Sequence, residues 1–336
     1  MKMKKGTILN SAILAASILF PLLSLKSQYQ LHVFNVTLIF IIFSMSFNLV
    51  FGFTGYMPLS HIGIWAVGAY TSAILSTRLG VSVWVTMLAG AFMAALFSYV
   101  IGLLAFRVRG HYFAILTLAF SEILIIIARN WVDLTGGAMG IVDIPLPRIH
   151  VPGIIEFSFT TRISYYYLLL AVTLCVLFLL WRILYSPLGR AFIAIREDET
   201  LSQSMGLKAL DFKLLSFCIS GFIAGLSGAL FCHYQQVLGP SNFAFAYLAQ
   251  VLAVVMVGGS RTFWGPVIGC IILVPLPELL RLFARYRLII FGSLLIVTII
   301  YAPKGLVGFF EEFRLRKKRL KGESKPLISK NQRRSL

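Results

Sequence analysis

Four consecutive charged residues, Arg196, Glu197, Asp198 and Glu199, lie between apolar runs of a chain in which only 12% of residues are charged. A segment this polar must face water, and the chemistry that suits it is binding to a soluble partner. Acidic side chains complement the positive N-terminal end of a helix, and Gly206 is suited to the left-handed conformation that ends one. The pattern predicts a short helix of about two turns, beginning near Glu197 and ending at Gly206.

Apolar residues accompany these charges at helical spacing. Leu188, Phe192 and Ile195 form a stripe that is suited to lying along the membrane interface. Leu201 and Met205 are four residues apart and therefore share one face of the expected helix. A short amphipathic helix favours insertion into a groove on a partner, and the alternative is a solvated connecting loop.

Two ionisable residues, His61 and Glu122, lie within apolar runs, where such residues are functional candidates. Each also has a structural alternative, a hydrogen bond to a neighbouring helix. An unpaired carboxylate in mid-span is costly, so Glu122 is expected to be paired, hydrogen-bonded or protonated. Gly52 and Gly55 let the backbone come close or unwind at membrane depth, as in interrupted helices that line substrate paths.

The elements that must position these residues are membrane spans. The hydrophobic fraction is 59% and the mean hydropathy is +0.88, both outside the range of soluble domains. We expect an all-α polytopic membrane protein with about 8–10 transmembrane segments, including broken or half helices. The apolar segments are 8–25, 31–51, 58–77, 82–106, 111–129, 164–184, 211–235, 247–259, 263–282 and 287–302, of which the third and eighth are short or interrupted by Gly.

The positions of Lys and Arg orient the chain. With a cytoplasmic N-terminus, 22 of the 30 lie inside and 8 outside, as the positive-inside rule favours. Both termini are then cytoplasmic, flanking a membrane domain at 8–312 with an N-terminal stretch at 1–7. The loop 186–210 is inside and the loop 130–163 outside. The tail 313–336 is basic and contacts anionic lipid rather than nucleic acid.

Sequence signatures of catalysis are absent. The chain has no GxxxxGK[ST] run, so it carries no P-loop for ATP. It has no HExxH run, no Cys/His cluster and no GxSxG elbow, and its four cysteines lie in apolar runs as expected for packing residues. These observations disfavour an intramembrane enzyme. An ion-coupled secondary transporter is a further remote alternative, with few acids at membrane depth to hold a coupling ion.

The polar loop 186–210 contains the four consecutive charges, and we call it the polar island. It resembles the cytoplasmic coupling loop of ABC importer permeases, in the form found in the branched-chain amino acid (Liv-type) family. The matching runs, in the family's order, are 186–191, 195–199, 205–207 and 213–217. The resemblance implies that this helix seats in a cleft of a cytoplasmic ATPase subunit. The residues it assigns to ATPase coupling are Arg196, Glu197, Asp198, Glu199, Met205 and Gly206.

Further blocks extend the resemblance over residues 36–310. They lie at 48–55, 61–70, 109–122, 135–140, 257–269 and 303–308. The substrate path implied by these blocks includes Asn48, Gly52, Thr54, Gly55, Tyr56, Ser60, His61, Glu122, Thr135, Gly136 and Gly137. The chain departs from the family's usual residues at Tyr56, Met57, Pro58 and Ser60, and again at Ala138 and Met139.

The resemblance implies a non-enzymatic permease subunit of an ATP-driven importer that works by alternating access in the bacterial inner membrane. Its expected partners are a second homologous permease, two ATPase subunits that hold ATP and Mg²⁺, an extracytoplasmic solute-binding protein and membrane lipid. No metal or cofactor is expected in this chain. Branched-chain or related amino acids are the expected solutes, with urea, short amides or aromatic acids as the alternative.

Overall fold

The computed structural model describes residues 28–276, without 109, 152–154 and 160, together with Gly292 and Gly305. Within these residues six helical segments are long and apolar enough to cross a membrane, which confirms the expected polytopic helical fold. They are Gln28–Thr54, Val83–Ala105, His111–Asn130, Arg162–Leu184, Ala209–Gln235 and Pro240–Gly258. The expected first and last spans and both terminal stretches lie outside the described residues.

The described elements follow one another with short connections. In chain order they are α2 (Gln28–Asn48), the π-helix η1 (Leu49–Thr54), α3 (His61–Arg78), α4 (Val83–Ala105), α5 (His111–Asn130), α6 (Val132–Thr135), β1 (Arg148–Val151), β2 (Ile155–Ser158), α7 (Arg162–Leu184), α8 (Pro187–Glu197), α9 (Glu199–Ser204), α10 (Ala209–Gln235), the 3₁₀-helix η2 (Pro240–Phe243), α11 (Phe245–Gly258) and α12 (Gly265–Leu273). The two strands form an antiparallel hairpin, an addition to the expected all-α fold.

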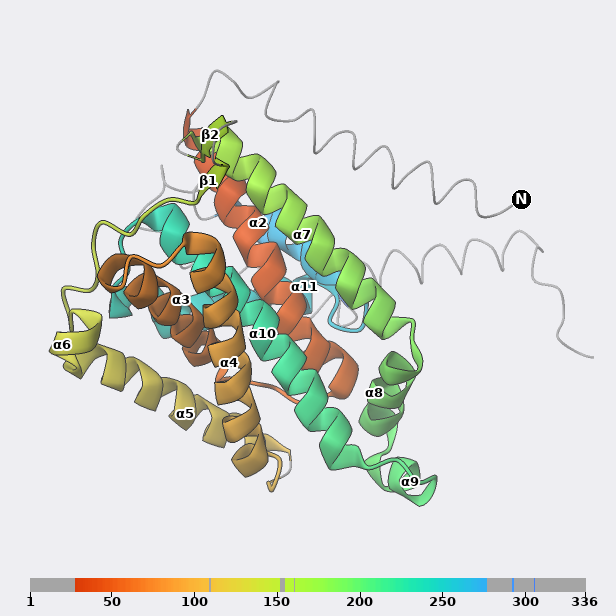
Figure 1. The fold of residues 1–336 in the computed structure, drawn as a ribbon. Helices are drawn as coiled ribbons and strands as arrows, with labels where there is room; N and C mark the ends of the chain where they lie inside the picture. The colour runs from red at the N-terminus through yellow and green to blue at the C-terminus, as the bar shows by residue number, and fades with distance from the viewer. Residues whose placement is uncertain are drawn as a thin grey trace, which may run out of the picture.

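Helices α2 and α10 form the centre of the bundle, and α3 and α4 pack against α10 (Figure 1). In the most apolar 18-residue stretch of the α2–η1 segment, 83% of the residues are buried. The corresponding share is 72% in α10 and only 28% in α5. Small residues make the central crossing possible. A Cβ on Gly68 of α3 would lie 2.3 Å from Cα of Gly225 in α10, so side chains are excluded there. The outer faces of α4, α5 and α7 are left for lipid or other subunits.

The bundle has two distinct ends (Figure 1). One end carries α8 and α9, and the β-hairpin lies at the opposite end. Helices α2, α4 and α7 run toward the α8–α9 end, and α3, α5 and α10 run back. The α8–α9 segment and the β-hairpin therefore lie at opposite ends of the bundle, and which end is cytoplasmic stays a prediction from charge. At the hairpin end, His233 joins α10 to Pro145 O and to Ser72 of α3, at 2.7 and 2.8 Å.

The late segments are broken rather than continuous. Helix α11 has 14 residues and reaches the 19-residue length of a candidate span only together with η2, whereas α12 has nine and at 1.5 Å per residue is too short to cross a core of about 30 Å. The loop 259–264 turns the chain between them. Pro275 follows α12, as expected of a residue that cannot continue a helix. The expected eighth segment is therefore short, as predicted, and the ninth is helical only at its start within the described residues.

Candidate functional site

Helix α8 begins the polar island and turns its apolar side toward the bundle. Ser186 caps it by accepting a hydrogen bond from the backbone N–H of Leu188, and Pro187 occupies its first turn. Phe192 and Ile195 are buried, as the predicted stripe requires. Leu188 is exposed, so the stripe is narrower than predicted and α8 packs on the protein rather than presenting all three residues to the interface.

Helix α9 confirms the predicted short helix and its end at Gly206, but it begins at Glu199, and Glu197 is instead the last residue of α8. Asp198 is the N-cap, and its Oδ1 accepts a hydrogen bond from the N–H of Leu201 at 2.9 Å. Gly206 follows the helix with φ +88°, the left-handed conformation expected of it. Leu201 and Met205 are 59% and 79% exposed. The α9 tip therefore presents a small apolar surface away from the bundle.

Arg196 links α8 to the glycine-rich segment at the end of α2. Its Nη1 donates a hydrogen bond to O of Gly52 at 2.5 Å, and its aliphatic stem lies against Gly55. Gly55 has φ +81° and lies so near Arg196 that a Cβ there would be 2.7 Å from Cγ. Burial, with the neighbouring positive charge of Arg261, lowers the pKa of Arg196. An ion pair to Glu197 at 3.6 Å opposes that shift.

Glu199, the first residue of α9, holds α9 to two other parts of the bundle. Its Oε1 lies 2.6 Å from Nζ of Lys213 in α10, and its Oε2 accepts a hydrogen bond from the Tyr56 hydroxyl at 2.8 Å. The Lys213 ammonium lies 4.6 Å from the centre of the Tyr56 ring, within cation–π range. We call Tyr56, Glu199 and Lys213 the junction triad. It joins the first residue of α9 to the loop after η1 and to the N-terminal part of α10.

The residues around Gly52 form the interruption that the sequence predicts. The α-helical ladder of α2 ends at Asn48 and widens into the π-helix η1, a feature frequent at functional sites. Asn48 Nδ2 donates to O of Thr262, and a Cβ on Gly52 would lie 1.8 Å from O of Ser260. Thr54 turns inward and bonds O of Val50. Close backbone approach, one of the two predicted uses of these glycines, is therefore present between η1 and the 259–264 loop.

His61 lies above this interruption, at the start of α3. It is fully buried, its Nε2 is 2.8 Å from Oγ of Ser46, and its ring stacks on Phe43. These contacts fit the structural alternative predicted for His61. Its Nδ1, Oγ of Ser60 and Oδ1 of Asn48 are buried and lack a hydrogen-bond partner within the described part of the chain. Three buried polar atoms beside the interruption therefore have no hydrogen-bond partner among the described residues.

Thr135, Gly136 and Gly137 lie at the hairpin end, away from the other predicted site residues. The Thr135 hydroxyl bonds O of Ala128 at 2.6 Å and accepts from N of Gly137. Gly136 and Gly137 have φ of +76° and +59°, so they complete a local turn. This geometry is that of an ordinary turn.

Glu122 lies on the exposed face of α5, near the middle of that helix. Ile115 and Ile126, which share this face at helical spacing, are exposed as well. The expected internal pairing of Glu122 with a neighbouring helix is not found among the described residues. The carboxylate therefore points out of this chain, from an apolar surface at membrane depth.

Lys213 is the member of the junction that sequence reasoning did not single out. Its side chain is only 4% exposed, and it is buried near the start of an otherwise apolar helix. A lone lysine at the edge of a membrane span needs a partner, and this was the signal available in the sequence. Tyr56 was predicted to lie on the substrate path and was noted as a departure from the family's residues, but its contact with Lys213 and Glu199 was not foreseen. The cysteines are all free; Cys232 and Cys270 are buried as expected, while Cys175 is exposed on α7.

Comparison with known proteins places the chain among transport proteins. The family described as "Branched-chain amino acid transport system / permease component" matches residues 29–299. The high-affinity branched-chain amino acid transport system permease protein LivM of Escherichia coli (strain K12) is 34% identical over 334 residues, covering 93% of this chain and 77% of that protein. The corresponding LivH protein of the same strain is 25% identical over 281 residues, covering 79% and 90%.

Among solved structures, "PsaBC from Streptococcus pneumoniae in complex with Fab" resembles the chain with a TM-score of 0.45 and 15% sequence identity. The likeness covers 92% of this chain and 99% of that one. It is too distant to carry an argument about function.

Proposed function

The chain belongs to the family of permease components of branched-chain amino acid ABC transport systems, and on that premise we propose how it couples ATP hydrolysis to solute movement. It is a multi-pass membrane protein and a non-catalytic transport subunit of the LivM-like type. In our proposal, ATPase subunits move α8 and α9, and these helices move the interrupted segment around Gly52. Alternating access of the pathway follows from that movement.

The α9 tip supports docking to an ATPase. Leu201 and Met205 are exposed and apolar, and an exposed apolar pair on a short helix suits a groove on a partner. Glu197 is exposed beside them, whereas Glu199 is engaged inside the chain. We therefore divide the predicted coupling residues. Glu197, Leu201 and Met205 meet the ATPase, and Arg196 and Glu199 carry the movement inward.

The junction triad is the observation that carries this proposal. It connects α9 to the loop after η1 through Tyr56 and to α10 through Lys213. Arg196 makes a second, independent connection to η1 through O of Gly52. Because Gly52 packs on the backbone of Ser260, a shift of η1 must also displace the 259–264 loop. One displacement at α9 thus reaches α2, α10 and α11–α12.

A second permease subunit and an aqueous pathway are proposed to cover the exposed face of α5. Burial of a carboxylate against lipid at mid-span is costly, so Glu122 favours water or a polar partner. The chain is similar to both LivM and LivH, two permease proteins named for the same kind of system, which implies a partner permease for this chain. Two ATPases with their ATP and Mg²⁺, a solute-binding protein and lipid complete the proposed assembly.

Branched-chain amino acids are the proposed solutes, because the similar LivM and LivH proteins are named for them. Urea, short amides and aromatic acids stay as the alternative, since Tyr56 and Ser60 depart from the family's usual residues. We propose the bacterial inner membrane as the location, with both termini and the 186–210 loop cytoplasmic, the 130–163 loop external, a membrane domain at 8–312, and the 1–7 and 313–336 ends flanking it.

The test is uptake and ATP hydrolysis by the complete transporter reconstituted in vesicles with its binding protein. Leu201→Asp should abolish ATPase binding and uptake, because it places a charge in the docked apolar surface. Leu79→Asp is the matched control, since Leu79 is equally exposed but lies after α3 at the opposite end. Normal ATPase binding and uptake by Leu201→Asp would overturn the docking proposal.

A further inference from the structure

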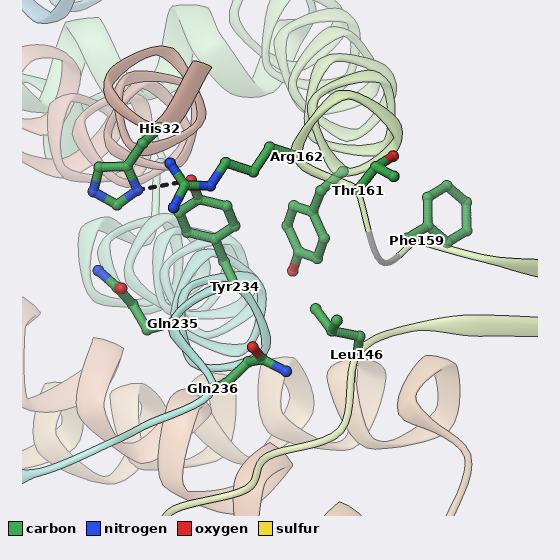
Figure 2. Close-up of a pocket in the computed structure, with 9 residues that line it drawn as sticks. His32, Leu146, Phe159, Thr161, Arg162, Tyr234, Gln235 and Gln236 are labelled. Carbon is green, nitrogen blue, oxygen red and sulfur yellow. Dashed lines mark hydrogen bonds between the residues drawn. The ribbon is translucent and has the colours of Figure 1, made fainter. Parts of the chain in front are cut away.

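A cavity of about 260 Å³ opens at the end of the bundle opposite α8 and α9 (Figure 2). This is far above the roughly 10–15 Å³ that a single water occupies on the same measure, so the cavity has room for a small solute. It lies between the starts of α2 and α7 and the end of α10. It is lined by His32, Leu146, Phe159, Thr161, Arg162, Tyr165, Tyr234, Gln235 and Gln236.

One side of the cavity is cationic. Arg162, the first residue of α7, extends toward His32 and Tyr234 (Figure 2). One of its nitrogens donates to O of Gln28 at 2.7 Å, and a guanidinium has four further N–H donors. No carboxylate is among the described lining residues, so the Arg162 charge is not neutralised from within the cavity. This side suits a carboxylate, which a guanidinium binds in a bidentate manner.

The opposite side is formed by the C-terminal end of α10, where the helix dipole is negative. Gln236 adopts φ +59° there, a conformation that favours glycine at a helix end. A side chain is retained at this position and lines the cavity, while its own carbonyl accepts from N of Ile144. The Tyr234 hydroxyl, 2.8 Å from Nδ1 of His32, lies beside Arg162 and belongs to the cationic side instead. Neutral oxygens beside a helix C-terminus suit an ammonium group.

A third side is apolar. Leu146 and Phe159 come from the segments that flank the hairpin, and the Tyr165 ring packs beside Tyr234 at 5.2 Å between centroids. The Tyr165 hydroxyl donates to O of Leu230, so it is already engaged within the bundle. An aliphatic side chain is the group that such a wall accepts.

We propose that this cavity binds a free α-amino acid as its zwitterion. The carboxylate bonds Arg162, the ammonium meets the α10 end near Gln236, and the aliphatic side chain packs on Leu146 and Phe159. The inference rests on the proposed function only for the identity of the solute, as a branched-chain amino acid held at the outer end of the pathway. The three sides match the three parts of such a molecule.

The test uses the complete transporter in lipid nanodiscs without its binding protein, exposed to a diazirine analogue of leucine and irradiated. Adducts mapped by mass spectrometry should fall on the cavity-lining peptides, and excess leucine should remove them. Leucinamide and 4-methylpentanoate, each lacking one charge, should compete at least about tenfold less well. Arg162→Gln and Gln236→Gly should each reduce labelling about tenfold or more.

Two choices keep the test decisive. Gln236→Gly removes the lining side chain and relieves its backbone, so poor folding cannot explain its loss of labelling. Arg148→Gln is the control for Arg162→Gln, because Arg148 is an exposed arginine of the same end that does not line the cavity. Equal labelling of wild type, Arg162→Gln and Gln236→Gly would overturn the proposal. So would the absence of cavity adducts in the wild type.

Uptake measured in parallel separates this inference from the proposed function. Cavity labelling in a transporter that imports no branched-chain amino acid would sustain the cavity and contradict the proposed solute. Normal uptake by the wild type without cavity labelling would sustain the proposed solute and contradict the cavity proposal. If Arg162→Gln reduces uptake driven by the binding protein but leaves labelling unchanged, the cavity receives an acidic side chain of that protein, and the zwitterion proposal is wrong.

Discussion

Nζ of Lys213 lies 2.6 Å from Oε1 of Glu199, across the boundary between a membrane span and the polar helix beside it. The lysine side chain is almost fully buried and the glutamate about three-quarters buried. Such a pair is costly to break from one side, because the remaining charge is left without its partner. This ion pair therefore holds α9 against α10.

Removal of either charge should weaken both the fold and transport. Lys213→Met leaves Glu199 without its cation and should lower the free energy of unfolding by about 3 kcal/mol. Glu199→Gln should have a similar effect, because it strands the lysine. Thermal unfolding in detergent and uptake in vesicles measure the two losses. The exchange Glu199→Lys with Lys213→Glu should recover part of both; no recovery would show that the pair does not act as a unit.

Charge-reversal variants should distinguish the role of Glu199, which is engaged inside the chain, from that of the exposed Glu197. Glu199→Lys should abolish uptake through repulsion of Lys213 while leaving the exposed α9 surface intact. Glu197→Lys changes a side chain that is 66% exposed, so its main effect should be on ATPase affinity, with a smaller effect through its 3.6 Å ion pair to Arg196. Pull-down of the ATPase and ATP hydrolysis with solute distinguish them. Identical behaviour of the two variants would contradict the division of roles.

Loss of the Tyr56 hydroxyl should uncouple hydrolysis from uptake. Tyr56→Phe removes one hydrogen bond to a charged group, worth about 1.5–3 kcal/mol, and keeps the ring over Lys213. Uptake per ATP hydrolysed should fall several-fold while assembly is retained. Tyr99→Phe on α4, where the side chain is 45% exposed, is the control and should behave as wild type. An unchanged ratio in Tyr56→Phe would remove the tyrosine from the coupling route.

A side chain at Gly55 should block transport in an assembled complex. Gly55→Val imposes a left-handed β-branched residue and collides with Arg196, which holds η1 to α8. Gly80→Val has a comparable φ of +62° but no atom within 4 Å of its new Cβ. The control therefore carries the same backbone strain without the collision. Uptake and complex assembly by size exclusion are the readouts. Equal uptake by both variants would contradict a role of Gly55 in transport.

Water should reach position 122 in the complete transporter. A Glu122→Cys variant in a Cys175→Ser background should react with a membrane-impermeant maleimide, because we place this face of α5 beside an aqueous pathway. Phe178→Cys is the control on the exposed face of α7, where lipid should exclude the reagent. Labelling is quantified by mass shift. Protection at 122 equal to that at 178 would mean that lipid covers this face of α5.

Several features followed from local chemistry. A short helix that begins near Glu197 and ends at Gly206 could be predicted because helix ends depend on neighbouring backbone groups, and the structure confirms Gly206 and places the N-cap at Asp198. The interruption at Gly52 could be predicted as well, since glycine permits what other residues forbid. The exposure of Glu122 could not, because spacing along the chain does not tell which face of a helix meets the bundle.

The sequence by itself determined the polytopic membrane class and the polar helix, since these depend on hydropathy and helix-end chemistry, while the sidedness of the loops stays a prediction. Tertiary structure decided that Tyr56, Glu199 and Lys213 meet, although 143 residues separate the first two. It also decided that Gly52 touches both Arg196 and Ser260. The reason is physical: each contact is made by packing of distant helices, and a buried charge shows only that it needs a partner, not which one.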